Sequence, residues 1–84
     1  MTMLREALER MNAGENGQFV PVSVPVQTER GVEKVQSFEL QWVERDGVDP
    51  MDRIVCRYRV TNRGDIAKIQ EAVRNNAAPA QLIR

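Results

Sequence analysis

The spacing of apolar residues at the start of the chain predicts a helix. Leu4, Leu8 and Met11 recur at intervals of four and three residues, which places them on one helical face. Thr2 can cap the first turn. Residues 12–17 contain two glycines and two asparagines, so we expect the helix to end there and the chain to turn.

From residue 19 the apolar pattern changes to every second residue, which is typical of a β-strand. One side of this strand carries Val20, Val22, Val24 and Val26. The other side carries Phe19, Pro21, Ser23, Pro25 and Gln27. Pro21 and Pro25 share a parity, so both missing N–H donors lie along the same strand edge. We therefore expect an edge strand with a buried valine row and a free proline edge.

Two further strands and a second helix follow. A turn at residues 28–31 leads to a strand over 32–45, with Phe38, Leu40 and Trp42 on its apolar face. After a loop at 46–50, a third strand over 53–61 points Ile54, Cys56, Tyr58 and Val60 inward. Its outward residues are Arg53, Val55, Arg57, Arg59 and Thr61. A helix then begins at Asn62 or Thr61 and carries an apolar stripe of Ile66, Ile69, Ala72 and Val73.

These elements predict an α+β fold in the order α-β-β-β-α. Three strands each offer one apolar face and two helices each offer one stripe, so the simplest arrangement is a three-stranded antiparallel meander with both helices packed on one face. We expect a single domain over residues 1–76 and a flexible C-terminal tail over 77–84.

The composition argues against several classes of function. The chain has 84 residues, 12 basic and 12 acidic side chains, one cysteine and no histidine. Without histidine it lacks the commonest general base and the commonest transition-metal ligand. We find no pair of carboxylates placed for acid–base chemistry, and we expect neither enzymatic activity nor a cofactor nor a metal. Asp46, Asp49 and Asp52 fit a turn better than a cation site.

The N-terminal residues and the single thiol suggest a location. Residues 1–6 lack the basic and apolar regions of a signal peptide. A lone cysteine forms no internal disulfide, so we expect a cytoplasmic protein with no membrane partner. Cys56 falls on the inward face, and we expect it to be inert toward thiol reagents.

Charge is segregated along the sequence and collects in an arginine row. Residues 1–52 carry 5 basic and 10 acidic side chains, whereas 53–84 carry 7 basic and 2 acidic. If Arg45 lies opposite Arg53 in the sheet, Gln41 faces Arg57 and Glu39 faces Arg59, which neutralises only part of the row. The candidate contact residues are Arg53, Arg57, Arg59, Arg63 at the start of the second helix, and an outward-facing Phe19. A solvated, partly paired sheet face explains the same arginines.

The element order is similar to that of double-stranded-RNA-binding domains, in topology only. In those domains a lysine-rich start to the second helix grips phosphates. The corresponding stretch here, residues 62–68, offers Arg63 and Lys68 together with Asp65, and contains no adjacent lysine pair.

Several functions fit these features. The first is a small non-catalytic interaction or assembly module that binds an acidic protein, or a second copy of itself, through the open sheet face. Alternatives are RNA-type nucleic-acid binding through the arginine row, an accessory role in a phage or mobile element, and a purely structural domain.

Overall fold

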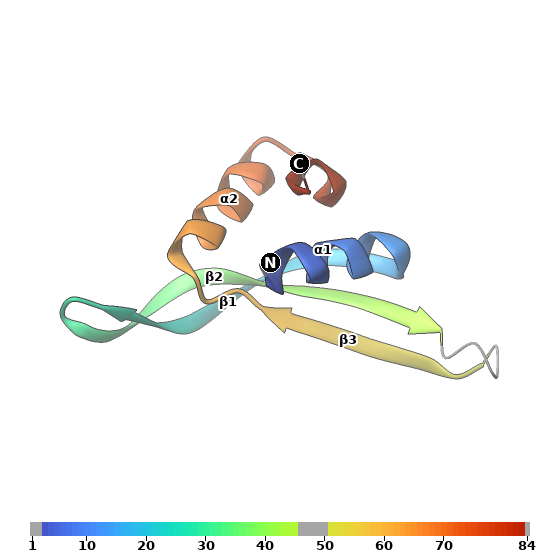
Figure 1. Cartoon of the computed structure of the whole chain (residues 1–84), viewed down its shortest axis with the longest axis horizontal. Coiled ribbons are helices and arrows are strands. Elements are labelled where there is room, and N and C mark those ends of the chain that lie inside the picture. Colours follow the sequence, from blue (N-terminus) through green and yellow to red (C-terminus); the bar gives the residue numbers. More distant parts are fainter. Residues whose placement is uncertain (1–2, 46–50, 84) are drawn as a thin grey trace.

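A computed structural model describes residues 3–45 and 51–83 and shows the α-β-β-β-α order expected from the sequence. The helices are α1 (Met3–Ala13) and α2 (Arg63–Arg74), and a short 3-10 helix, η1 (Pro79–Leu82), follows. The strands β1 (Glu15–Thr28), β2 (Gly31–Arg45) and β3 (Arg53–Arg59) form one antiparallel sheet in the order β1-β2-β3. Both helices lie on the same side of this sheet (Figure 1).

The ends of the elements follow from local chemistry. The side chain of Asn62 accepts a hydrogen bond of 3.2 Å from the backbone N–H of Asp65, which caps α2 as expected. Gly31 adopts a φ of 104° at the β1–β2 turn, a conformation that glycine tolerates best. β1 begins earlier than expected, at Glu15, because Asn16 with a φ of 57° accommodates a register irregularity between Glu15 and Gln18.

The prediction of a free proline edge is confirmed, since among residues 3–45 and 51–83 β1 pairs only with β2. The N–H of Val60 donates to the carbonyl of Phe38 at 3.1 Å. Because antiparallel bonding alternates along a strand, Phe38 and the residues of its parity bond toward β3, and the intervening residues of β2 bond toward β1. The β1 partners of these intervening residues include Val20 and Val22. The backbone nitrogens and carbonyls of Pro21 and Pro25 therefore point to the free edge of β1.

Along the β1–β2 hairpin, the set of alternate residues that faces the core changes from one set to the other. Near the turn, Val24 and its partner Val35 face inward, and Val24 is fully buried. Farther along, Leu40 and Trp42, which have the opposite parity, are buried instead. Two-stranded ribbons twist strongly, and the two strands visibly cross in Figure 1. This twist lets opposite faces of one hairpin contact helices on the same side.

The parity change corrects two expectations for β1. Phe19 was expected to face outward, but it lies opposite Leu40 and packs against Phe38, with ring centroids 6.5 Å apart. The expected valine row is buried only toward the turn: Val24 and Val26 are buried, whereas Val20 and Val22 are partly exposed. The error arose from treating one parity as inward along the whole strand.

The core lies between the sheet and the helices. It is built from apolar side chains of both helices, of β1 and β2, and of Val60 just after β3, namely Leu4, Ala7, Leu8, Met11, Val24, Val26, Phe38, Leu40, Trp42, Val60, Ile66 and Ile69. Ile54 and Val73, both expected to point inward, are 52% and 39% exposed. The side chain of Ile54 lies on the same side of β3 as that of Cys56, but Ile54 is near the start of the strand at Arg53.

The C-terminal segment differs from the expected tail. Its residues Leu82 and Ile83 pack against the hydrophobic core, and η1 lies beside α1 and α2 (Figure 1). The apolar pair at 82 and 83 explains this docking, because burying it removes apolar surface from water.

Candidate functional site

The outward face of β2 and β3 brings the arginine row together. The register is the one expected from the sequence: Arg45 lies opposite Arg53, Gln41 opposite Arg57, and Glu39 opposite Arg59. Directly paired residues share a face of the sheet. The helices lie on the other side (Figure 1), and all the arginine side chains of this row are exposed. We call this surface the arginine face; its residues are Glu39, Gln41, Val43, Arg45, Arg53, Val55, Arg57 and Arg59.

Acidic side chains compensate part of the arginine face. Glu15, where β1 begins, lies 3.1 Å from Arg45 and 3.6 Å from Arg53. Glu39 lies 3.6 Å from Arg59 and also accepts a 2.8 Å hydrogen bond from the amide of Gln41. Such surface pairs contribute only about 0–1 kcal/mol each. They order the arginines without removing the excess of positive charge.

Arg57 stands apart within this face. Across the ladder it meets the uncharged Gln41, and within residues 3–45 and 51–83 no ion pair involves its guanidinium. Val55, the next residue of the same parity, is 61% exposed. An uncompensated guanidinium beside an exposed apolar side chain is a suitable contact for a carboxylate-bearing partner.

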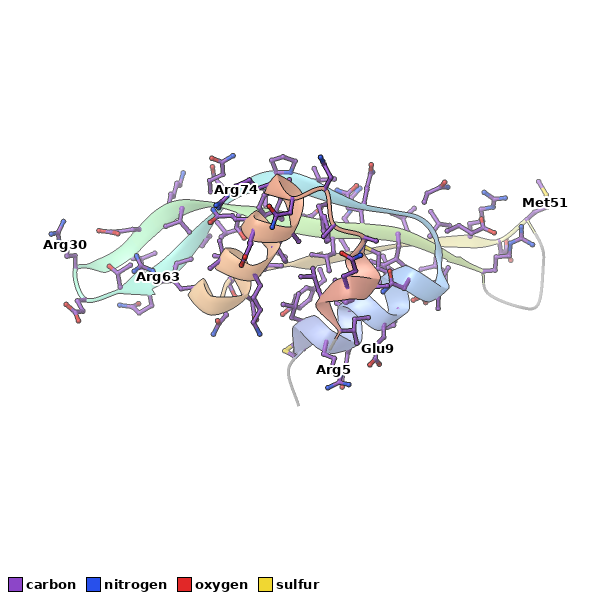
Figure 2. The ribbon with its side chains drawn as sticks, turned by 90° about the horizontal axis from the view of Figure 1, so that it is seen from above. Arg5, Glu9, Arg30, Met51, Arg63 and Arg74 are labelled. Carbon is purple, nitrogen blue, oxygen red and sulfur yellow. The ribbon has the colours of Figure 1, made fainter. Side chains whose placement is uncertain are left out.

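Two of the expected contact residues lie elsewhere. Arg63 begins α2 and approaches Glu33 of the hairpin at 3.9 Å. Figure 2 shows it toward the turn that carries Arg30, far from the Met51 end of the sheet. Phe19 belongs to the core side, as described above. Only Arg53, Arg57 and Arg59 therefore share one surface.

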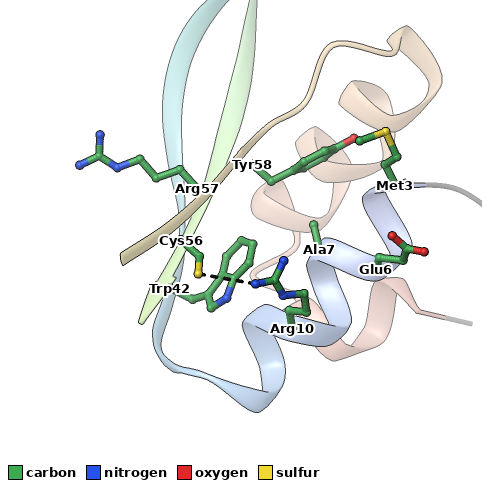
Figure 3. A pocket seen from close by; sticks show the side chains of 8 residues that line it. All are labelled: Met3, Glu6, Ala7, Arg10, Trp42, Cys56, Arg57 and Tyr58. Carbon is green, nitrogen blue, oxygen red and sulfur yellow. Dashed lines mark hydrogen bonds between the residues drawn. The ribbon is translucent and has the colours of Figure 1, made fainter. Parts of the chain in front are cut away.

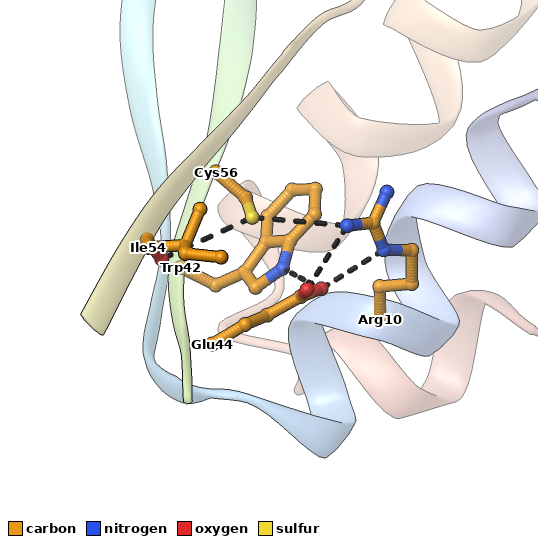
Figure 4. Close-up of polar contacts among 5 residues, drawn as sticks. All are labelled: Arg10, Trp42, Glu44, Ile54 and Cys56. Atoms are coloured by element: carbon orange, nitrogen blue, oxygen red, sulfur yellow. Dashed lines mark hydrogen bonds and ion pairs between the residues drawn. The ribbon is translucent and has the colours of Figure 1, made fainter. Parts of the chain in front are cut away.

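A polar cluster that the sequence did not reveal joins α1 to the sheet. Arg10 donates to both carboxylate oxygens of Glu44, at 2.9 and 3.0 Å, and the indole N–H of Trp42 donates to the same carboxylate at 2.8 Å (Figure 4). The Arg10 guanidinium also lies 5.6 Å from the centroid of the Trp42 ring. These contacts orient α1 on the sheet. The sequence predicted the helix that carries Arg10 and the strand that carries Trp42 and Glu44, but not that the two lie against each other.

The cluster shifts the pKa of three groups, and the hydrogen bond with Glu44 is the main cause that raises the pKa of Arg10. Hydrogen bonds from Arg10 and then from Trp42 lower the pKa of Glu44 from 4.5 to about 2. Burial, followed by the charge of Glu44, raises the pKa of the Cys56 thiol. A raised pKa leaves less thiolate at neutral pH, which favours the expectation that Cys56 is inert toward thiol reagents. Cys56 is nevertheless only partly buried, because it lines a pocket between α1 and β3.

Acidification is expected to weaken the fold through Glu44. Since its pKa is lower in the folded chain, its stabilising contribution is complete above the unfolded pKa of 4.5 and disappears as the pH falls toward 2. Urea unfolding at a series of pH values measures this loss. Glu44→Gln keeps an acceptor for Trp42 but does not titrate, so its midpoint should fall less steeply than that of the wild type in this window. Parallel curves would contradict the assignment.

The described residues offer no metal centre: no three His, Cys, Asp or Glu side chains gather among residues 3–45 and 51–83. Of the expected aspartate turn, Asp46 and Asp49 lie outside the described residues, and Asp52 is exposed. None of the described helices has the length and apolar character required to cross a membrane. Comparison with family models, curated proteins and solved structures finds no match, so function has to be inferred from the chain's own residues.

Proposed function

We propose that the protein is a small non-catalytic interaction module that binds an acidic protein partner through the arginine face. The observation that carries this proposal is the position of Arg57, which has no ion pair among residues 3–45 and 51–83 and lies next to the exposed Val55 on a side of the sheet that the helices leave open. We place the module in the cytoplasm, because its single thiol suits a reducing compartment.

The charge of the arginine face favours a protein over a nucleic acid. Among the residues that the structure describes, the four arginines on this face pair with Glu15 and Glu39, which leaves an excess of 4 − 2 = +2. Nucleic-acid affinity depends on neutralising many phosphates, and two carboxylates on the same surface would repel them. Val43 and Val55 lie between the arginines, which provides the mixed apolar and cationic contact that protein interfaces use.

A double charge reversal, Arg53→Glu with Arg57→Glu, tests the proposal. Short poly-glutamate at low ionic strength serves as the acidic probe, and calorimetry measures its affinity. We expect binding to weaken about tenfold or more, while the free energy of unfolding changes by only about 0.5–1 kcal/mol because both sites are exposed. The matched control, Arg30→Glu with Arg74→Glu, makes the same change in net charge away from the arginine face and should bind like the wild type.

Three outcomes would overturn the proposal. The first is equal affinity of the reversal variant and the control. The second is tighter binding of an RNA duplex than of poly-glutamate, which would assign the arginine face to nucleic acid. The third is a wild-type dimer in light scattering that the reversal variant dissociates, which would assign the face to self-association.

A further inference from the structure

The free edge of β3 exposes backbone groups beside the arginine face. Within the part of the chain that the structure describes, β3 pairs only with β2, and the bond from Val60 to Phe38 fixes which of its residues bond inward. By alternation, the residues at 54, 56 and 58 bond to β2, while those at 53, 55, 57 and 59 direct their N–H and C=O groups outward. The unpaired backbone groups therefore belong to the residues whose side chains form the arginine face.

The two edges of the sheet differ in how they resist a further strand. β1 carries Pro21 and Pro25 on its free edge, which removes donors there. β3 contains no proline and is protected by charge alone. Charge repels most strands but attracts a strand of opposite charge. The β3 edge can therefore accept an acidic strand, whereas it repels a basic one.

A pocket borders the same edge on the side of the helices. Its volume is about 320 Å³, and it lies between α1 and β3. Ala7, Trp42 and Tyr58 supply apolar lining, and the Arg57 side chain points away from it (Figure 3). A side chain that enters along β3 with the parity of Cys56 and Tyr58 would face this pocket.

We propose that the partner supplies an extended, amphipathic acidic segment that adds to β3 as a fourth strand. This inference rests on the proposed function and specifies its mode. Carboxylates on one side of the segment lie opposite Arg59, Arg57 and Arg53, with an aliphatic residue opposite Val55. On the other side, an apolar residue opposite Cys56 faces the pocket. Backbone hydrogen bonds supply affinity and the alternating side chains supply specificity.

Charge disfavours a second copy of the chain at this edge. If two β3 strands paired antiparallel about Cys56, Arg53 of each copy would lie opposite Arg59 of the other. Like charges directly opposite each other destabilise a sheet pair. An acidic segment replaces this repulsion with attraction at the same positions.

The test uses a capped heptapeptide, Glu-Val-Glu-Leu-Val-Thr-Glu, designed to run antiparallel to β3 from Arg59 to Arg53. Its odd-numbered residues direct their N–H groups to β3, and its even-numbered residues direct theirs to solvent. One modified peptide carries N-methyl groups on the second Glu and the second Val, which face β3. The matched control carries them on Leu and Thr, which face away. Fluorescence anisotropy of labelled peptides measures each affinity.

Strand addition predicts that the first modified peptide binds about tenfold or more weakly than the control, and that Arg53→Glu with Arg57→Glu weakens binding of every peptide. If both modified peptides bind alike but the reversal still weakens them, strand addition is wrong and the arginine face stands. If the reversal has no effect, the proposed function fails whatever the N-methyl peptides do. If the unmodified peptide does not bind, strand addition by this pattern is refuted, and poly-glutamate then decides the proposed function.

Discussion

Leu40→Ala is expected to unfold most of the protein at room temperature. Leu40 is fully buried in the central strand, between Phe19 on β1 and Tyr58 on β3. Replacing a buried leucine by alanine costs about 2–5 kcal/mol, because apolar contacts are lost and a cavity remains. A domain of this size rarely has more than roughly 3–5 kcal/mol of stability. Circular dichroism with urea titration measures the change in the free energy of unfolding.

Val32→Ala is the matched control for this substitution. Val32 lies in the same strand but is 67% exposed, so its truncation should change the free energy of unfolding by no more than about 0.5 kcal/mol. If Leu40→Ala proves as mild as Val32→Ala, the placement of the core between sheet and helices is wrong.

Gly14→Ala is expected to destabilise the fold by about 1–3 kcal/mol through overpacking. A methyl group at this position would lie 2.8 Å from Cδ1 of Trp42 and 2.8 Å from the carbonyl oxygen of Val43. The carbonyl belongs to the central strand and cannot move without disturbing the sheet. Trp42 is held by Glu44 and stacks with Arg10, so it has little freedom to yield. Thermal and urea unfolding measure the loss.

Ala13→Ser provides the comparison, because Ala13 is exposed at the end of the same helix. It should change stability by less than about 0.5 kcal/mol. Equal stability of Gly14→Ala and Ala13→Ser would show that α1 does not meet the sheet as closely as described.

Local sequence pattern was sufficient to predict the two α-helices and the three strands, but not η1. Periodicity located both helices and all three strands, and the parity of Pro21 and Pro25 identified the edge strand. The pairing of Glu39 with Arg59 follows once Arg45 is taken to lie opposite Arg53, and the structure has this register. Each of these features depends on residues that are close in sequence or joined by one turn.

Features that depend on twist and docking could not be predicted in this way. The twist of the long hairpin exchanges its buried face, which moved Phe19 from the outer surface to the core. The contact of Arg10 with Glu44 joins residues 34 positions apart, through the placement of a helix on a sheet. Arg63 is positively charged like the residues of the arginine face, but it lies on a different surface because it belongs to α2. Periodicity predicts which residues share a face of a strand or helix, but it does not predict which other element packs against that face.

An NMR titration of the isotopically labelled chain tests most directly whether the arginine face is the contact surface. Poly-glutamate is added at low ionic strength and the backbone amide shifts are followed. The account predicts that the largest shifts fall on β3, at Arg53, Val55, Arg57 and Arg59, and on their β2 neighbours. Shifts concentrated instead near Arg30 and Arg63 at the hairpin end, or along α2, would contradict it.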